Sequence, residues 1–203
     1  MLLYDTALAP NSKRVRIFLA EKGISIPMRS VDLLALEQKG EDFRRINPMG
    51  AVPALALDDG EVLTESVAIC RYIEWLHPEP PLLGRDGREQ AFVEMWQRRM
   101  EFSLFLPVAM VFRHTHPKLA AMQQPQLPDY AASLRPRAIE VMRFLDGELS
   151  GRPYVAGDAF TVADITAFVA MGLTKLAGIE VPDDLLHLAR WRQDVSARPS
   201  AAA

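Results

Sequence analysis

Strand-sized apolar segments occur only in the first third of this chain, and this asymmetry limits the folds that it can adopt. Four short apolar runs bounded by turn residues are typical of strands, and they lie in MLLYD, in IPMRSVDL and on both sides of the turn in AVPALALDDGEVL. Between the first two, KRVRIFLAEKG has helical spacing and ends at Gly23. We therefore predict a βαβ unit followed by a hairpin that turns at Asp59-Gly60.

The composition then changes. The stretch HPEPPLLGRDG holds three prolines and two glycines in eleven residues, which is typical of a linker between domains. The rest shows only helical periodicity, in one long run bent or interrupted at Pro107 and in another that carries Pro136. We therefore predict an α/β domain with a mixed four-stranded sheet over residues 1–77, a linker over 78–87 and an all-α domain over 88–203.

The clearest helix start in the all-α part lies in FTVADI. Thr161 has the spacing of an N-cap that forms a capping box with Asp164, and Phe160 is placed to pack against Ile165. A helix is therefore expected to begin directly after Thr161.

Composition and charge argue against several classes of protein. Hydrophobic residues make up 49% of the 203, enough for a sizeable core, and the net charge of −3 leaves no basic surplus for nucleic acid or an anionic membrane. No run approaches the roughly 18 apolar residues of a spanning helix, and the start lacks a signal peptide, so we expect a cytoplasmic protein. The single cysteine, Cys70, lies on the apolar face of a predicted helix, so we expect it to be a buried structural residue. Because His114 and His116 are two residues apart and point to different faces, we expect no metal.

The segment NPMGAVPAL places Pro53 between a loop and an edge strand. A cis bond before this proline would turn the N–H and C=O of Val52 outward, where an extended peptide can pair with them. The alternative is a plain turn with a trans proline.

The segment TESVAIC begins a helix, whose free backbone N–H groups favour an anion. Ser66 adds a hydroxyl donor for a carboxylate, and Glu65 adds a negative charge for an ammonium group. Together they suit the zwitterionic end of an amino acid. The alternative is that Thr64 and Ser66 only cap the helix and that Glu65 only complements its dipole.

The order of PNSKRVRIFLAEKG, NPMGAVPAL, LTESVAICRYI, the proline-rich linker and FTVADI resembles the cytosolic glutathione transferase family across essentially the whole chain. The resemblance implies a thioredoxin-like first domain with Pro53 in the cis form, an all-α second domain, a homodimer, and glutathione as co-substrate. By the same resemblance, Val52 pairs with the cysteinyl part of glutathione, and Glu65 and Ser66 hold its γ-glutamyl end. Lys39 is the expected cation for the glycyl carboxylate, unless it is only a solvated lysine.

The group that activates the sulfur departs from the family's common pattern. In the serine-dependent classes a hydroxyl residue precedes the first helix, whereas Ala9 occupies that position here. The segment APN resembles the nu class and related fungal proteins, which have an asparagine at this turn. Asn11 is therefore the first candidate for the sulfur ligand and Ser12 the second, and the alternative is that Asn11 is only an N-cap.

The all-α part offers two further candidates. His114, near the end of a helix, is placed to orient a water on the sulfur, as a histidine does in some atypical family members; alternatively it only complements the helix C-terminus. Phe102, Phe105 and Leu106 are candidates for the lining of an apolar electrophile pocket, although such a stripe is more often core.

The resemblance leaves the reaction open between two uses of a glutathione thiolate. One is attack on a small apolar electrophile, and the other is reduction of a disulfide or peroxide, which the Asn11 pattern slightly favours. An isomerase or dehalogenase would use the same site. The alternative from another class is an interaction module with this fold that binds a partner and catalyses little.

Overall fold

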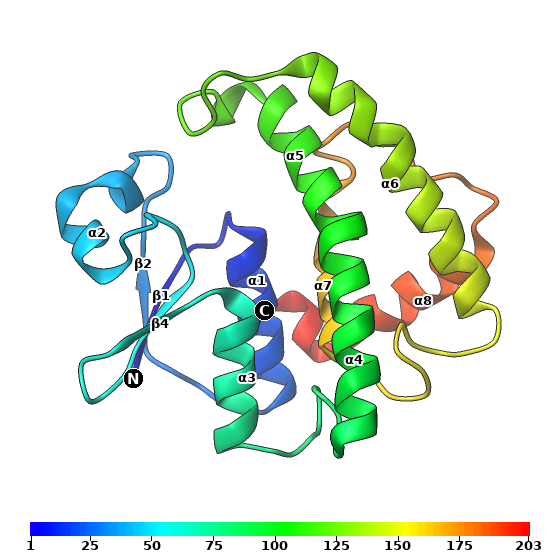
Figure 1. Ribbon diagram of the computed structural model, residues 1–203, viewed down its shortest axis with the longest axis horizontal. Coiled ribbons are helices and arrows are strands. Elements are labelled where there is room, and N and C mark those ends of the chain that lie inside the picture. Colours follow the sequence, from blue (N-terminus) through cyan, green and yellow to red (C-terminus); the bar gives the residue numbers. More distant parts are fainter. The chain divides into compact units, whose positions relative to one another are not determined.

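A computed structural model describes residues 1–203 and shows the predicted strands joined in one four-stranded sheet, in the order β2-β1-β3-β4 (Figure 1). β1 (Leu2–Asp5) is parallel to β2 (Met28–Ser30), because α1 (Pro10–Glu21) returns the chain between them. β3 (Ala54–Ala56) is antiparallel both to β1 and to β4 (Val62–Thr64). The predicted βαβ unit, hairpin and mixed sheet are confirmed.

The two faces of the sheet are covered by different helices. Leu3 in β1 is fully buried, and α1 packs along α3 (Ser66–Leu76) on one side of the strands (Figure 1). Because side chains alternate along a strand, Tyr4 points to the other side. There its ring meets that of Phe43 edge to face, with 5.9 Å between centroids. Phe43 belongs to α2 (Glu41–Ile46), which follows the short helix η1 (Glu37–Lys39).

The hairpin turn forms where the sequence indicates it. Gly60 has a φ of +92°, a conformation that residues with a Cβ rarely adopt, and the N–H of Glu61 donates to the carboxylate of Asp59. The N–H of Leu57 closes the loop on the carbonyl of Glu61 at 2.8 Å.

The chain divides into two compact units. The sheet and its helices lie in Met1–Pro81, to which Ala202–Ala203 also belong, and the second unit is Leu82–Ala201. This second unit is helical: α4 (Gly87–Arg99), η2 (Met100–Phe105), α5 (Leu106–Thr115), η3 (Pro117–Leu119), α6 (Pro128–Leu149), α7 (Val162–Leu173) and α8 (Leu186–Ser196). A last short helix, η4, covers Pro199–Ala202.

The two prolines in the long helical runs have different effects. The interruption expected at Pro107 takes the form of the wider π-helical turn η2, which lies directly between α4 and α5. Pro107 has no N–H to donate to the preceding turn, so the regular hydrogen-bond ladder cannot continue unchanged there. Pro136, by contrast, lies inside α6, which runs unbroken from Pro128 to Leu149.

The helix start at Thr161 is confirmed. Thr161 is the N-cap of α7, and Asp164 completes the capping box from the third helical position. Asp164 is fully buried and accepts four hydrogen bonds, from the N–H of Val155 (2.8 Å), the N–H (3.0 Å) and hydroxyl (3.1 Å) of Thr161, and Nε1 of Trp191 (2.9 Å). Nearly every side chain of α7 is buried, so this cap fixes the start of the central helix of the unit.

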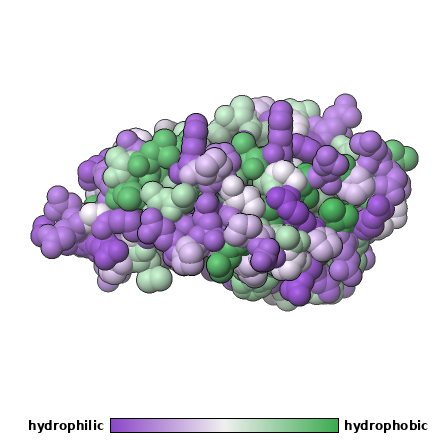
Figure 2. All heavy atoms as spheres, turned by 90° about the horizontal axis from the view of Figure 1, so that it is seen from above, coloured by the Kyte–Doolittle hydropathy of each residue, from purple (hydrophilic) through white to green (hydrophobic).

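Hydrophilic residues predominate on the face that Figure 2 shows, with hydrophobic ones in small groups among them. None of the helices combines the length and the apolar character needed to cross a membrane.

Candidate functional site

Asn11 lies in the first turn of α1 and is not the N-cap of this helix. Ala9 is the N-cap and forms no side-chain hydrogen bond, Pro10 is the first helical residue, and Asn11 follows inside the helix. The reading of Asn11 as an N-cap is therefore wrong. Asn11 is partly exposed whereas Ser12 is fully buried, so of these two candidates only Asn11 presents its side chain at the surface.

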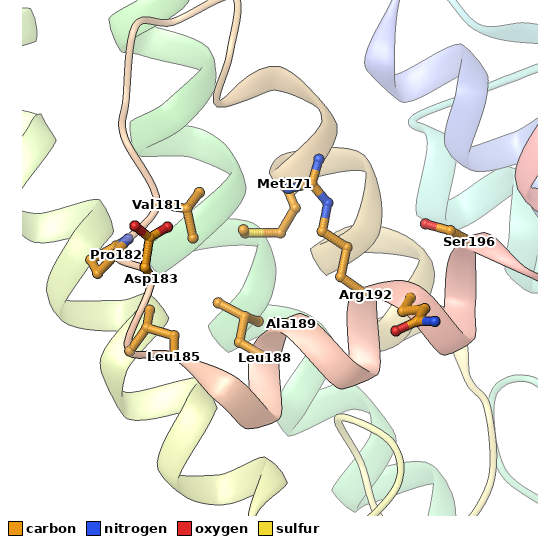
Figure 3. A pocket seen from close by; sticks show the side chains of 10 residues that line it. Met171, Val181, Pro182, Asp183, Leu185, Leu188, Ala189, Arg192 and Ser196 are labelled. Atoms are coloured by element: carbon orange, nitrogen blue, oxygen red, sulfur yellow. The ribbon is translucent and has the colours of Figure 1, made fainter.

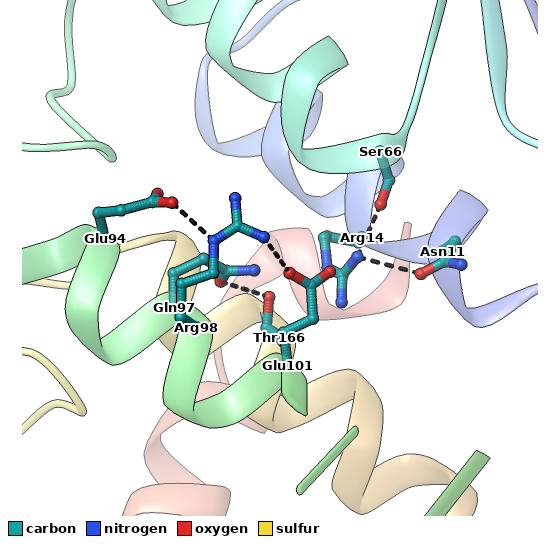
Figure 4. Close-up of polar contacts among 8 residues, drawn as sticks. All are labelled: Asn11, Arg14, Ser66, Glu94, Gln97, Arg98, Glu101 and Thr166. Carbon is teal, nitrogen blue, oxygen red and sulfur yellow. Dashed lines mark hydrogen bonds and ion pairs between the residues drawn. The ribbon is translucent and has the colours of Figure 1, made fainter. Parts of the chain in front are cut away.

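A buried arginine connects Asn11 to the second predicted segment. Arg14 is 1% exposed, and its Nη1 donates to Oδ1 of Asn11 at 3.0 Å and to Oγ of Ser66 at 2.6 Å. Figure 4 shows the guanidinium group between the two side chains, which come from α1 and α3. Arg14 is not among the site residues that the sequence predicts. The only signal was its helical spacing from Phe18, which places a charged residue on the apolar face of α1.

The start of α3 is shaped by an unusual backbone conformation. Glu65 is its N-cap with a φ of +66°, makes no capping hydrogen bond, and is exposed. Non-glycine residues at positive φ cluster at functional sites, where the surrounding structure holds them in place. Ser66, the first residue of the helix, is 6% exposed. Neither Thr64 nor Ser66 is therefore the N-cap, so the alternative that these two residues only cap the helix is wrong.

The loop before β3 is held by Asn47. Its Nδ2 donates to the carbonyl of Ala51 at 2.7 Å, and its Oδ1 accepts from the N–H of Met49 at 3.1 Å. The peptide bond between Val52 and Pro53 is cis, as the resemblance implies. Val52 precedes β3, and no hydrogen bond of the chain uses its backbone N–H or C=O.

Lys39 lies beside the same loop. Its Nζ donates to the carbonyl of Gly50 at 3.0 Å, and the residue is exposed. Gly50 has a φ of +58°, and a Cβ there would lie 2.7 Å from the carbonyl oxygen of Gln38. The close approach of these two backbone segments requires glycine, and it places the ammonium group of Lys39 at the rim of the loop.

The predicted residues of the helical unit lie on η2 and α5. Phe102 and Leu106 are 58% and 44% exposed, whereas Phe105 is buried at 7%. His114 is also buried, and its Nδ1 accepts from the N–H of Leu127 at 2.9 Å. Its ring meets that of Tyr130 edge to face, so the contacts of His114 in its own unit are structural ones.

The helical unit also has a pocket that the sequence did not predict. Its volume is about 520 Å³, and Figure 3 shows it between α8, the end of α7 and the loop before α8. The lining includes Met171, Val181, Leu188 and Arg192. None of the predicted electrophile-site residues lines it.

Cys70 is confirmed as a buried residue of α3. Burial raises the pKa of its thiol to about 12; the charge of Arg14 opposes this rise, and that of Glu74 adds to it. Cys70 is therefore neutral at physiological pH and has no access to solvent.

Comparison with known proteins finds the same family in both the N-terminal and the C-terminal part of the chain. The profile of the glutathione S-transferase N-terminal domain matches residues 3–81, and that of the C-terminal domain matches residues 109–199. Glutathione S-transferase 2 of Saccharomyces cerevisiae is 36% identical over an alignment of 203 positions, which covers 98% of this chain and 87% of that protein.

Solved structures agree with this assignment. A glutathione S-transferase domain-containing protein from Marinobacter aquaeolei VT8 is 37% identical, with a TM-score of 0.95 over 98% of this chain and 99% of that one. A glutathione transferase homologue from Sulfitobacter, solved with bound glutathione, is 27% identical, with a TM-score of 0.80 over 99% of this chain and 94% of the other. The chain belongs to the glutathione S-transferase family.

Proposed function

We propose that this glutathione transferase binds glutathione at the starts of α1 and α3 and along the loop before β3, and that it activates the thiol through Asn11. The observation that carries the proposal is the pair of helix starts joined by Arg14, one with the partly exposed amide of Asn11 and the other with the hydroxyl of Ser66. The Sulfitobacter homologue, which binds glutathione, supports the choice of ligand.

The γ-glutamyl end fits the start of α3. The first N–H groups of a helix have no partner within the helix, and its dipole favours a negative charge, so this helix start suits the α-carboxylate. The hydroxyl of Ser66 adds a donor at the same point. Glu65 is exposed beside it and supplies the negative charge for the α-ammonium group.

The rest of the tripeptide follows the loop toward Lys39. The backbone N–H and C=O of Val52, beside cis Pro53, pair with the cysteinyl residue as one more short strand. The exposed ammonium group of Lys39 then reaches the glycyl carboxylate. In this arrangement each charged end of glutathione meets a group of opposite charge or a set of donors.

The chemistry follows from the sulfur position. The amide of Asn11 and the N–H groups at the start of α1 favour the thiolate over the thiol, which lowers the thiol pKa. The thiolate then either forms a thioether with an apolar electrophile, whose leaving group departs with the bonding electrons, or attacks a disulfide or peroxide. In the second case the S–S or O–O bond breaks, a thiolate or hydroxide leaves with the bonding electrons, and the glutathione sulfur becomes a mixed disulfide or a sulfenic acid. Phe102 and Leu106, both exposed, remain our candidates for contact with an apolar electrophile.

The two remaining expectations for this enzyme concern its assembly and His114. A homodimer, which the family resemblance implies, is tested by analytical ultracentrifugation. A water held by His114 has less support than Asn11, because Nδ1 of the histidine already accepts from the backbone of Leu127.

The test of the proposed function is binding followed by ionisation. Calorimetric titration with glutathione should show binding, and the thiolate absorbance of the complex should titrate well below the pKa of free glutathione. Absence of binding would instead favour an interaction module that has kept this fold. Binding with an unshifted thiol pKa would contradict the assignment of Asn11 and the start of α1 to activation.

A further inference from the structure

We propose that Arg14 is a positioning residue that makes both Asn11 and Ser66 hydrogen-bond donors toward glutathione. This inference rests on the proposed function and assigns a role to a residue that does not itself touch the ligand. Both bonds come from one nitrogen, Nη1, at 3.0 Å from Oδ1 of Asn11 and 2.6 Å from Oγ of Ser66. Nη1 carries two hydrogens, one for each acceptor.

The chemistry of the guanidinium group decides the orientation of the asparagine. Arginine has donors and no acceptor, so an amide that bonds to it must present its oxygen. The NH₂ group of Asn11 then points away from Arg14. Because Asn11 is partly exposed while Arg14 is buried, the NH₂ group lies on the solvent side, where a thiolate would accept its hydrogens. With the amide reversed, its oxygen would face the sulfur and repel the negative charge.

The same argument applies to Ser66. Its oxygen accepts from Arg14, so its own hydrogen is left to donate to another acceptor. A carboxylate has only acceptors when ionised, and it requires such a hydrogen. Arg14 therefore acts in the same way at both ends of the site. By occupying an oxygen of Ser66 and of Asn11, it leaves a hydrogen-bond donor for the γ-glutamyl end and one for the sulfur.

The positive charge of Arg14 also acts on its neighbours in α3. On α3, Cys70 lies near enough for the charge of Arg14 to act on it, but burial keeps that thiol neutral. Glu74, the carboxylate on the same helix that also acts on Cys70, forms an ion pair with Lys22 at 2.6 Å. Arginine is charged throughout the physiological pH range, so Arg14 can donate to both acceptors before glutathione binds.

The experiment compares the wild-type enzyme with Arg14→Met and with a matched control, Arg16→Met. Arg16 lies on the same helix and bonds Asp5 at 2.7 Å and the carbonyl of Thr6, not Asn11 or Ser66. In Arg14→Met the thiol pKa of bound glutathione should rise by about one unit, because the amide is no longer held with its donors outward. The affinity for S-methylglutathione, which has no thiol, should fall about fivefold through Ser66. Arg16→Met should change neither quantity, and an unchanged thiol pKa in folded Arg14→Met would overturn the inference.

A double-mutant cycle separates orientation from simple charge. If Arg14 acts on the sulfur through Asn11, the variant Asn11→Ala/Arg14→Met should have the same thiol pKa as Asn11→Ala alone. If the two shifts add, Arg14 acts through its charge and the orientation of the amide is not its role.

A measurement on the wild-type protein covers the case in which Arg14→Met does not fold. In nuclear magnetic resonance spectra, the side-chain NH₂ signals of Asn11 should move on addition of glutathione above its bound thiol pKa and stay in place with S-methylglutathione. Equal shifts with both ligands would overturn the inference. Failure of wild-type enzyme to bind either ligand would instead contradict the proposed function, so the two failures are distinguishable.

Discussion

Asn11 is the residue on which the proposed activation depends most directly. Replacing it with alanine removes the NH₂ donors and leaves the start of α1 intact, because Ala9 and Pro10 begin the helix without it. We expect Asn11→Ala to raise the thiol pKa of bound glutathione by about one unit, as the loss of a hydrogen bond to the charged form does. The measurement is the thiolate absorbance against pH. Affinity for S-methylglutathione serves as the control and should not change.

Ala9, the N-cap of α1, allows a test in which a serine hydroxyl is added at the start of the helix. Its side chain makes no capping hydrogen bond, so a residue that makes one there should stabilise the protein. Ala9→Ser should raise the free energy of unfolding by about 1 kcal/mol, because a serine oxygen accepts from the free N–H groups of the first turn. The serine hydrogen remains a donor, so thioether formation should also become faster. A stability gain without a rate gain would show that this position does not face the sulfur.

Lys39 is a test of the glycyl end. Lys39→Met should raise the dissociation constant for glutathione up to about fivefold, since an ion pair of an exposed lysine contributes up to about 1 kcal/mol. The matched ligand is γ-glutamylcysteine, which lacks the glycyl residue. Calorimetry should show that wild type and Lys39→Met bind it equally. A similar loss of affinity for both ligands would mean that Lys39 acts only by holding the carbonyl of Gly50.

Among the helix starts of the protein, that of α7 should contribute the most to the free energy of unfolding. Asp164→Ala leaves four buried donors without their acceptor, and each orphaned group costs about 1–3 kcal/mol, so we expect a loss of at least about 3 kcal/mol in the free energy of unfolding. The matched control is Asp86→Ala at the exposed N-cap of α4, which should cost about 1 kcal/mol. Chemical denaturation measures both, and equal losses would contradict the role of burial.

The same carboxylate gives stability a defined dependence on pH. Burial raises the pKa of Asp164 from 3.8 to about 6, and the hydrogen bonds from Val155, Trp191 and Thr161 limit the rise. Because the folded state holds the proton more tightly than the unfolded chain, the contribution of Asp164 is largest below pH 3.8 and decreases as the pH rises to about 6. Denaturation of wild type and Asp164→Asn across this range should show a relative loss for wild type with rising pH, and no further change above it.

The elements that local signals specify were predictable from the sequence, and those that depend on packing were not. The turn at Asp59-Gly60 and the capping box of Thr161 and Asp164 are set by residues close in sequence, so their spacing reveals them. The π-helical turn before Pro107 depends on how the backbone hydrogen bonds rearrange near a residue that has no N–H. The spacing of residues in the sequence does not show this rearrangement. The bond between Arg14 and Ser66 joins residues 52 positions apart, and only the packing of α1 on α3 brings them together.

The family resemblance indicated the ligand, and the structure added the burial of each candidate residue, which the sequence does not show. Adjacent residues such as Asn11 and Ser12 carry the same polar signal in the sequence, yet one is partly exposed and the other fully buried. Phe105 likewise shares an apolar stripe with Phe102 but lies in the core. The grouping of Ala202–Ala203 with the first unit could not be predicted, because it depends on long-range contacts of residues without any pattern.

Cys70 allows a test of whether the protein's own thiol takes part in any turnover. It is the only cysteine, it is fully buried, and burial raises its pKa to about 12, so the folded molecule offers neither access nor a thiolate. Iodoacetamide should therefore label Cys70 only through unfolding, at a rate that rises with denaturant.

Cys70→Ala should lose about 1 kcal/mol or more of stability through the small cavity that it creates, and it should keep its glutathione-dependent activity within about twofold. The measurement is turnover with an apolar electrophile and with a small disulfide, at equal glutathione. If the disulfide reaction alone disappears, the protein thiol exchanges with glutathione during turnover, which requires α3 to open. If both reactions remain, every electron pair used in a reduction comes from the glutathione thiolate, and the fold supplies only the donors that stabilise it.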